Sequence, residues 1–453
     1  MALRLPGFEG TGTFDKGVHP PERKEFSENA PVEVVPTPER VVVPLIQNIG
    51  APSECIVKAK QVVAMGEPIA KSTAFVSVPI HAPIAGKVMK TTNVTLPNGR
   101  HIPAVPIKAE GEQLEGDALM TDILGGEWPK DSDTKYDPKT IADAVQAAGI
   151  VGLGGAAFPT HVKIMPNDKV TIDALLINGC ECEPYLTTDY RVMMEAPDAV
   201  VCGALLAGRA VDAKAVVIGI EANKPKAVEA IQKAAQGTRV QVAVLKTKYP
   251  QGSEKHLIKA VMNRKVPPGK LPMDVGAAVS NVGTVVAIAR AVLRGKPLTH
   301  RVVCVTGAGI AQPKNLLVPI GIRYQDLIDY CGGVTSNAAR IISGGPMMGF
   351  AFTDLEAPVT KGTSAVTVLT REDVQKAEET NCVRCGRCVD VCPLNLVPSK
   401  LGIASRNKNA DLAEKYHIFT CLECGSCAYT CPASLPLVQL IRMGKALVTA
   451  SKQ

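Results

Sequence analysis

The stretch that decides the fold is Cys382-Val383-Arg384-Cys385-Gly386-Arg387-Cys388-Val389-Asp390-Val391-Cys392-Pro393. Its spacing, Cys-x2-Cys-x2-Cys-x3-Cys-Pro, returns in a later run formed by Cys421, Cys424, Cys427, Cys431 and Pro432. Three close thiolates followed by a fourth cysteine beside a proline are typical of a 4Fe–4S site. The sequence therefore predicts two 4Fe–4S clusters and a protein that moves electrons.

The pairing of the cysteines follows from this spacing, because the fourth cysteine of each run reaches the cluster of the other run. We predict one cluster on Cys382, Cys385, Cys388 and Cys431, and the other on Cys421, Cys424, Cys427 and Cys392. Zinc and disulfides fit poorly, since tetrahedral zinc sites use two Cys-x2-Cys pairs per metal rather than a triple and a Cys-Pro.

The remaining composition is that of an ordinary globular chain of 453 residues, 21% charged and 46% hydrophobic, long enough for about three domains. Six further cysteines are scattered and no secretory signal precedes them, so we expect free thiols in a reducing cytoplasm. No stretch reaches the roughly 20 apolar residues of a membrane span. The net charge of +7 fits either ordinary solubility or a docking surface for an acidic carrier or a membrane, and no basic cluster indicates nucleic acid.

The N-terminal third is predicted to form an arm followed by a β domain. Residues 1–40 lack an apolar period and predict an extended arm, and residues 41–115 contain short β runs at 40–46, 54–58 and 75–79. The phrases Gly66-Glu67-Pro68-Ile69-Ala70 and His81-Ala82-Pro83-Ile84-Ala85-Gly86-Lys87-Val88 resemble the two halves of a lipoyl or biotinyl carrier domain. That resemblance implies a β barrel-sandwich hybrid. No lysine stands at the expected tip, 72–75, so swinging-arm chemistry is not implied.

The rest of the chain predicts an α/β multidomain protein with three further units. Residues 135–298 predict a Rossmann-like α/β domain, with a helix at 138–148 and a strand, helix and strand at 215–220, 224–235 and 240–245. Residues 299–370 predict a small mixed module with strands at 302–305 and 316–319 and a helix at 324–331. Residues 371–453 predict a helical cysteine domain, with helix from 372, one helix over 398–418 and a closing or docking helix over 435–450.

A glycine-rich loop and a polar strand end are the candidate binding features. The loop Gly152-Leu153-Gly154-Gly155-Ala156-Ala157-Phe158 can expose main-chain N–H groups to a phosphate or let a flat ring lie against the backbone. A buried strand at 175–177 runs into Asn178-Gly179-Cys180-Glu181-Cys182-Glu183, and polar residues at such carboxyl ends bind ligands in open α/β sheets. Taken alone, the loop is as compatible with an ordinary turn as with a ligand site, whereas a surface turn is the less favoured interpretation of Glu181 and Glu183.

Three segments together resemble the FMN- and NADH-binding subunit of respiratory complex I: residues 152–163, residues 178–184 and Asn281-Val282-Gly283-Thr284. The order of arm, barrel-sandwich, flavin domain, β-grasp-like module and two-cluster domain resembles the C subunit of the Rnf electron-transport complex over nearly the whole chain. Departures from the complex I pattern occur at Leu153, Ala157, Cys180, Cys182 and Tyr185.

The resemblance implies roles for individual residues. Gly152, Gly154, Gly155 and Ala156 would line the FMN and NADH phosphates, with Phe158 near the nucleotide and Lys163 on a phosphate or ribose. Asn178, Glu181 and Glu183 would face the isoalloxazine and nicotinamide rings, and Glu181, Glu183 and Lys163 would serve hydride transfer. Asn281 and Thr284 would contact the FMN phosphate, and Glu221 would bind a ribose or cap a helix.

The implied function is that of a peripheral, NAD-side subunit on the cytoplasmic face of the cell membrane, passing electrons between NAD(H), FMN and two 4Fe–4S clusters. Its partners would be the membrane subunits of the Rnf complex and its ferredoxin-like subunit. A soluble NADH-dependent reductase similar to cobalamin reductase, and a pure electron-transfer subunit without nucleotide binding, are the alternatives.

Overall fold

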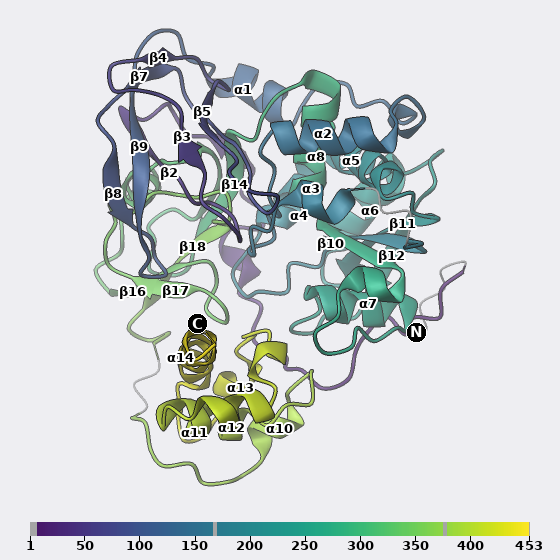
Figure 1. Cartoon of the computed structure of the whole chain (residues 1–453), viewed down its shortest axis with the longest axis vertical. Coiled ribbons are helices and arrows are strands. Elements are labelled where there is room, and N and C mark those ends of the chain that lie inside the picture. Colours follow the sequence, from purple (N-terminus) through teal and green to yellow (C-terminus); the bar gives the residue numbers. More distant parts are fainter. Residues whose placement is uncertain (1–6, 166–169, 375–377, 453) are drawn as a thin grey trace.

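The computed structural model describes residues 7–165, 170–374 and 378–452, so parts of the predicted arm and cysteine domain lie outside the described residues. Figure 1 shows a β-rich part and an α/β part side by side, with a smaller helical part projecting from them.

Residues 40–109 form two small antiparallel sheets around a shared core that includes Val41, Ile69 and Ile107. The larger sheet has the order β2-β9-β7-β4 with β8 on β9, and its strands are β2 (Arg40–Pro44), β4 (Val62–Val63), β7 (Gly86–Val88), β8 (Thr92–Thr95) and β9 (His101–Ala109). The smaller sheet consists of β3 (Glu54–Cys55), β5 (Pro68–Lys71) and β6 (Ile80–His81). The expected strand at 75–79 is wrong, because β5 pairs with β6 instead and Phe75 lies 58% exposed in the preceding loop.

The α/β domain is built on a parallel sheet of order β12-β11-β10-β13. Alternate residues of β10 enter different cores: Leu175 and Ile177 pack with α2, α5 and α8, while Leu176 packs with α7. Both faces are therefore covered, as parallel sheets require. The strands are β10 (Ala174–Gly179), β11 (Ala215–Glu221), β12 (Val240–Leu245) and β13 (Ala277–Asn281). The helices are α1 (Gly116–Ile123), η2 (Ser132–Thr134), α2 (Pro138–Ala147), α3 (Thr160–Ile164), α4 (Thr188–Glu195), α5 (Pro197–Ala210), α6 (Pro225–Ala234), α7 (Glu254–Met262), η3 (Pro272–Val275) and α8 (Val282–Arg294).

A second, mixed sheet contains both a segment of the predicted arm and the strands after residue 299. Its order is β1-β15-β14-β18-β16-β17, and α9 (Tyr324–Tyr330) packs on it. The strands are β1 (Val32–Val34), β14 (His300–Thr306), β15 (Lys314–Pro319), β16 (Ala338–Ser343), β17 (Phe350–Phe352) and β18 (Ala365–Thr370). β1 belongs to the residues expected to form an extended arm, and it pairs in parallel with β15. With the short helix η1 (Lys24–Phe26), it fixes the arm against the body.

The cysteine domain is helical only after its first motif has begun. Residues 378–386 contain no helix, so the expected helix from 372 is wrong. The expected single helix over 398–418 is interrupted at 407–409, where Lys408 has a φ of 51°, a left-handed conformation that ends a helix. The elements are α10 (Arg387–Asp390), α11 (Pro398–Arg406), α12 (Ala410–Lys415), η4 (Ile418–Thr420), α13 (Ser426–Tyr429) and α14 (Leu437–Ala450).

Candidate functional site

The candidate nucleotide site lies where the strand order of the parallel sheet changes direction. β10 pairs with β11 on one side and with β13 on the other, and ligands of open α/β sheets bind at the carboxyl ends of strands that flank such a point. Asn178 and Asn281, both expected ligands, are register partners at the ends of β10 and β13. The structure therefore brings together two residues that are far apart in the sequence.

The glycine loop lies over the beginning of α8. Gly152 N–H donates to the Phe158 carbonyl at 2.8 Å and closes the loop, while Leu153 N–H donates to Thr284 Oγ1 at 2.9 Å. A Cβ on Gly154 would lie 3.4 Å from Cβ of Asn281. Gly155 has a φ of 111° and no atom within 4 Å of a Cβ position, a conformation that L side chains rarely adopt.

The main chain from Gly154 to Ala156 is exposed. A bare, open backbone beside a helix N-terminus fits a phosphate or a flat ring, and thus fits FMN. Asn281 caps α8 by accepting from Gly283 N–H at 2.9 Å, and its amide donates to Asp189 at 2.7 Å. Asn281 and Thr284 thus shape the site through bonds inside the protein.

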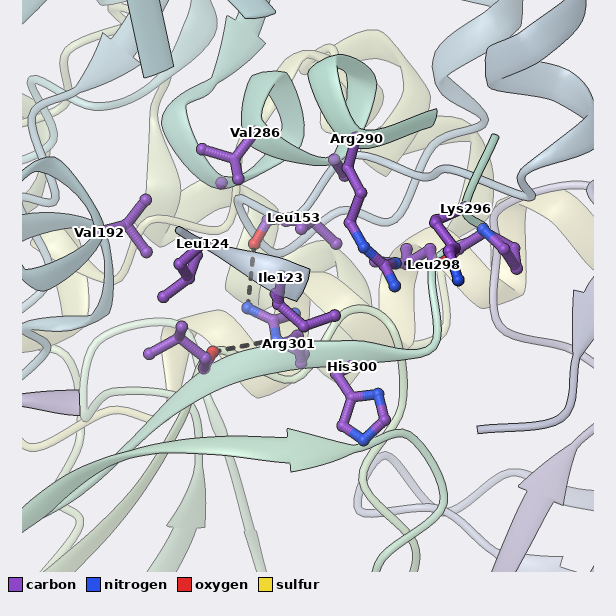
Figure 2. Close-up of a pocket in the computed structure, with 14 residues that line it drawn as sticks. Ile123, Leu124, Leu153, Val192, Val286, Arg290, Lys296, Leu298, His300 and Arg301 are labelled. Atoms are coloured by element: carbon purple, nitrogen blue, oxygen red, sulfur yellow. Dashed lines mark hydrogen bonds between the residues drawn. The ribbon is translucent and has the colours of Figure 1, made fainter. Parts of the chain in front are cut away.

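A buried arginine donates a hydrogen bond to the main chain of the glycine loop. Arg301, on β14, is 4% exposed and donates to the Leu153 carbonyl at 3.4 Å and to the Lys361 carbonyl. Figure 2 shows the contact with Leu153 beside a cavity that is lined mainly by apolar side chains of α1, α8 and β14, with Arg290, Lys296 and His300. Leu153 lines this cavity and is buried, so the apolar side chain that departs from the complex I pattern packs inward.

The polar segment after β10 is held by two buried lysines. Lys24 of the arm is 6% exposed and donates to the carbonyls of Glu181 at 2.9 Å, Glu183 at 3.1 Å and Leu186 at 2.6 Å. Lys224 donates to the Cys180 carbonyl at 2.6 Å and to the Glu221 carboxylate at 3.2 Å. Burial lowers the pKa of Lys24. Sequence reasoning missed both lysines, because a single lysine with no local pattern carries no signal of long-range contact.

The two expected glutamates after β10 have different surroundings. Glu181 is buried, and its carboxylate accepts from the N–H groups of Asp189 at 2.7 Å and Tyr190 at 3.1 Å, which caps α4. Glu183 instead accepts from Met347 N–H at 2.7 Å and Met348 N–H at 3.1 Å through one carboxylate oxygen, and its other oxygen lies 3.2 Å from the Tyr249 hydroxyl. Burial raises the pKa of Glu183.

Three further expected ligands are engaged within the protein. Asn178 donates to the Gly252 carbonyl at 2.7 Å. Glu221 is 1% exposed, pairs with Lys224 and accepts from Lys248 N–H at 3.1 Å, so its carboxylate lies inside the protein rather than at an open ribose site. Lys163 forms a half-exposed ion pair with Glu254, with 2.5 Å between Nζ and Oε1. Sequence reasoning had not identified Glu254 as part of the site.

Two of the departures after β10 are also buried. Cys180 is fully buried, and this burial raises the pKa of its thiol. Tyr185 is 6% exposed and stacks on Phe26 of the arm with ring centres 5.9 Å apart. Near the glycine loop, the Lys163 Nζ lies 6.0 Å from the ring centre of Phe158.

Cys392, Cys421, Cys424 and Cys427, here called the inner set, line one cavity together with Gly425, Val438 and Ile441. N–H groups approach two of the sulfurs: Glu423 N lies 3.3 Å from Cys421 Sγ and Leu396 N lies 3.4 Å from Cys392 Sγ. Backbone donors of this kind stabilise thiolate-bound clusters, so this cavity fits a 4Fe–4S group.

Cys382, Cys385, Cys388 and Cys431, here called the outer set, lie nearer to solvent. Thr380 N–H donates to the Ala433 carbonyl at 3.0 Å, which holds the segment before Cys382 next to the segment after Cys431. Within the described ranges, no three His, Cys, Asp or Glu side chains converge as single-ion ligands. A cubane does not need such convergence, because its four thiolates bind four different irons. The outer set as cluster ligands stays a prediction.

The inner set directly contacts Tyr249 and Met347, which neighbour Glu183 of the candidate nucleotide site; this part of the molecule is here called the nucleotide side. The Tyr249 hydroxyl donates to the Cys424 carbonyl at 2.6 Å and also contacts Glu183. A Cβ on Gly425 would lie 2.6 Å from the Met347 carbonyl oxygen, so glycine permits this close packing. Glu183, Tyr249, Met347 and Cys424 thus form one contiguous network.

Comparison with known proteins matches four family models along the chain. They are the RnfC barrel sandwich hybrid domain at 12–112, the Nuo51 FMN-binding domain at 145–290, the SLBB domain at 302–351 and a 4Fe-4S dicluster domain at 378–435. These domains define a flavin and iron–sulfur oxidoreductase subunit and confirm the predicted fold class and cofactor types.

Full-length relatives narrow this class to one family. The chain is 45% identical, over 96% of its length and 93% of the relative, to the C subunit of the proton-translocating ferredoxin:NAD(+) oxidoreductase complex of Clostridium ljungdahlii. It is 42% identical, over 98% of each chain, to the Na(+)-translocating counterpart of Acetobacterium woodii. It is 40% identical, over 95% of its length and 82% of the relative, to the C subunit of the ion-translocating oxidoreductase complex of Rhodobacter capsulatus.

The chain belongs to the RnfC family, as its sequence resemblance indicated. Among the described residues, no helix combines the length and apolar character that a bilayer crossing would need.

Proposed function

We propose that this chain is the NAD-side subunit of an ion-translocating ferredoxin:NAD oxidoreductase and that it binds FMN, NAD(H) and two 4Fe–4S clusters. The observation that carries the proposal is the exposed loop Gly154–Ala156 at the change of strand order. Glu183, which follows β10 of the same sheet, contacts Tyr249, and Tyr249 donates to the Cys424 carbonyl. The match of residues 12–112 to the RnfC barrel domain favours a subunit of the membrane complex over a soluble reductase.

Each group of residues has a distinct task in this proposal. Gly154, Gly155 and Ala156 provide the exposed main-chain surface and N–H groups, and Asn281 and Thr284 fix the distance of the loop from α8. The Lys163 Nζ lies 6.0 Å from the ring centre of Phe158 and is available for a phosphate if it exchanges its partner Glu254. Asn178, Glu181 and Glu183 hold the strand end rigid, which orients rings bound there and excludes water.

Bound FMN supplies the conversion between hydride transfer and single-electron transfer. The inner and outer cysteine sets hold the groups that accept single electrons. Hydride exchange between bound NAD(H) and FMN would require no acid or base from the described residues at the reacting carbon. The protein would lie on the cytoplasmic face of the membrane, with the complex's membrane subunits and ferredoxin-like subunit as partners.

The test uses the purified full-length chain with reconstituted clusters and FMN. We expect NADH to bleach the bound flavin anaerobically, and Lys163→Ala to weaken NADH binding while Lys214→Ala, which removes the comparable exposed ion pair with Asp173, behaves as wild type. If the purified protein binds neither flavin nor NADH, a pure electron-transfer subunit is the correct assignment.

A further inference from the structure

Most of the net positive charge of the chain lies on one domain. Residues 40–109, which form the two small antiparallel sheets, contain eight lysines and arginines and two glutamates, so they carry +6 of the chain's net +7. The other 42 basic and 41 acidic residues of the chain nearly balance. All eight cations of the domain are exposed. The positive charge is therefore a property of this domain's surface and not of the protein in general.

Three of these cations form a row across the larger sheet, here called the cation row. Lys87 of β7 is the register partner of Lys108 of β9, and Lys108 is also the register partner of Arg40 of β2. The neighbouring residues Val41 and Ile107 are buried in the core between the sheets, so the cation row lies on the outer face. Like charges directly opposite each other on a sheet are destabilising. The domain thus keeps an arrangement of charge that its own folding does not favour.

Acidic side chains leave much of this charge uncompensated. Lys108 lies 4.0 Å from Glu39, which is 87% exposed, and Arg40 lies 3.5 Å from the half-exposed Glu356. Ion pairs with such exposure contribute little to stability. Among the described residues, Lys87 has no carboxylate within ion-pair distance, and neither do four other cations of the domain. The cation row is therefore free to meet an anionic partner.

Exposed aliphatic side chains extend the cation row. Val62 of β4 is the register partner of Lys87 and is 65% exposed, and Met89, two residues after Lys87, is 43% exposed. In Figure 1, β4 and β7 lie at the top of the β-rich part, away from the cysteine domain at the bottom. Both cavities described above lie outside residues 40–109. This face thus fits an extended anionic surface better than a small molecule.

We propose that the cation row, with Val62 and Met89, binds the surface of an anionic lipid bilayer. Lysines near such a surface are attracted to the phosphate headgroups, while their aliphatic stems and neighbouring apolar side chains reach the interface. Six of the domain's eight cations are lysines, and lysine is depleted in protein–protein interfaces, so the composition favours lipid over an acidic protein. This inference goes beyond the proposed function, in which partner subunits hold the chain at the membrane.

The test measures co-sedimentation of the full-length holoprotein with vesicles of phosphatidylcholine alone and with vesicles of phosphatidylcholine and phosphatidylglycerol in equal amounts. Wild type should bind the anionic vesicles and not the neutral ones, and the affinity should fall as salt is raised. Lys87→Gln/Lys108→Gln should bind roughly ten- to thirtyfold more weakly, since each lysine near an anionic surface contributes about a factor of five. Lys226→Gln/Lys233→Gln removes the same charge from exposed positions of α6 and should bind as wild type.

Thermal unfolding of the same variants separates a loss of binding from a loss of folding. Because Lys87→Gln/Lys108→Gln removes repulsion between facing cations, its midpoint should not fall below that of wild type.

The outcomes also separate this inference from the proposed function. Absence of binding to anionic vesicles, equal binding to neutral ones, or an equal loss in the control would overturn the lipid-binding surface. Binding of wild type only to vesicles that carry the membrane subunits of the complex would overturn it too, and would assign this face to an acidic protein. Bleaching of the flavin by NADH should be unchanged in both variants, and its failure in wild type would instead overturn the proposed function.

Discussion

The inner and outer cysteine sets have the same sequence spacing, and the tertiary structure gives them different positions. The inner set lies against Tyr249 and the Met347 loop, while the outer set lies on a surface loop with Arg384 and Arg387. A ligand motif therefore indicates which group is bound, and the packing around it decides with what the group exchanges electrons.

The largest effect is expected from removing one ligand of each set. In Cys424→Ser, NADH should no longer reduce the outer cluster, because electrons from the nucleotide side would reach it through the inner cluster. In Cys385→Ser, NADH should still reduce the inner cluster. Electron paramagnetic resonance after NADH addition distinguishes the two. Reduction of the outer cluster at the wild-type rate in Cys424→Ser would show that the order of the two clusters is wrong.

Loss of the arm's anchoring lysine should have the next largest effect. Lys24→Met leaves three carbonyls without their donor, and each such loss costs about 1–3 kcal/mol, so we expect the free energy of unfolding to fall by roughly 3 kcal/mol or more, with loss of flavin. Lys16→Met, from the same arm but bonded to the single Val389 carbonyl beside the outer set, is the control and should lose about 1 kcal/mol. Denaturant unfolding followed by flavin fluorescence measures both.

A smaller effect is expected from the hydroxyl that joins the inner set to Glu183. Tyr249→Phe keeps the ring and removes one hydrogen bond worth about 1–1.5 kcal/mol, so we expect about a tenfold slower reduction of the inner cluster and a shift in its potential. Tyr330→Phe, which removes a hydroxyl contact to Glu33 away from the cysteine sets, should leave both unchanged. If the rate of reduction and the potential of the inner cluster were the same in both variants, Tyr249 would have no role in positioning the inner set.

The smallest effect concerns pH. Because burial raises the pKa of Glu183 above its ordinary 4.5, the folded protein keeps a proton that the unfolded protein has lost. This contribution to stability is present at low pH and is lost as pH rises through the raised pKa, by about 1.4 kcal/mol per pKa unit. As the pH rises above 4.5 toward neutrality, the free energy of unfolding of Glu183→Gln should therefore fall less than that of wild type. Thermal unfolding across that range measures it, with Glu254→Gln as control.

Much of the fold was predictable because its signals are local. The strands β10, β11 and β12, the helices α2 and α6, and the closing helix α14 lie within a few residues of their expected ranges, since apolar periodicity encodes them directly. The errors occur where tertiary contacts decide: the break at Lys408, the pairing of β6, and the parallel pairing of β1 with β15, a strand distant in the sequence.

The candidate site was predictable only in part for the same reason. Glycines and strand-end polar residues indicate a binding edge. Lys24, Lys224, Tyr249 and Glu254 belong to no pattern and reach the site only through the fold. Glu221 has the expected place at the end of β11, and its burial with Lys224 is a property of packing.

By itself, the sequence determined the cluster type and the order of domains, because ligand spacing and apolar periodicity depend on neighbouring residues. Only the tertiary structure decided which cysteine set faces the nucleotide side and which faces solvent. Burial depends on residues distant in the chain, such as Tyr249 and Met347, and two identical motifs cannot specify their own surroundings.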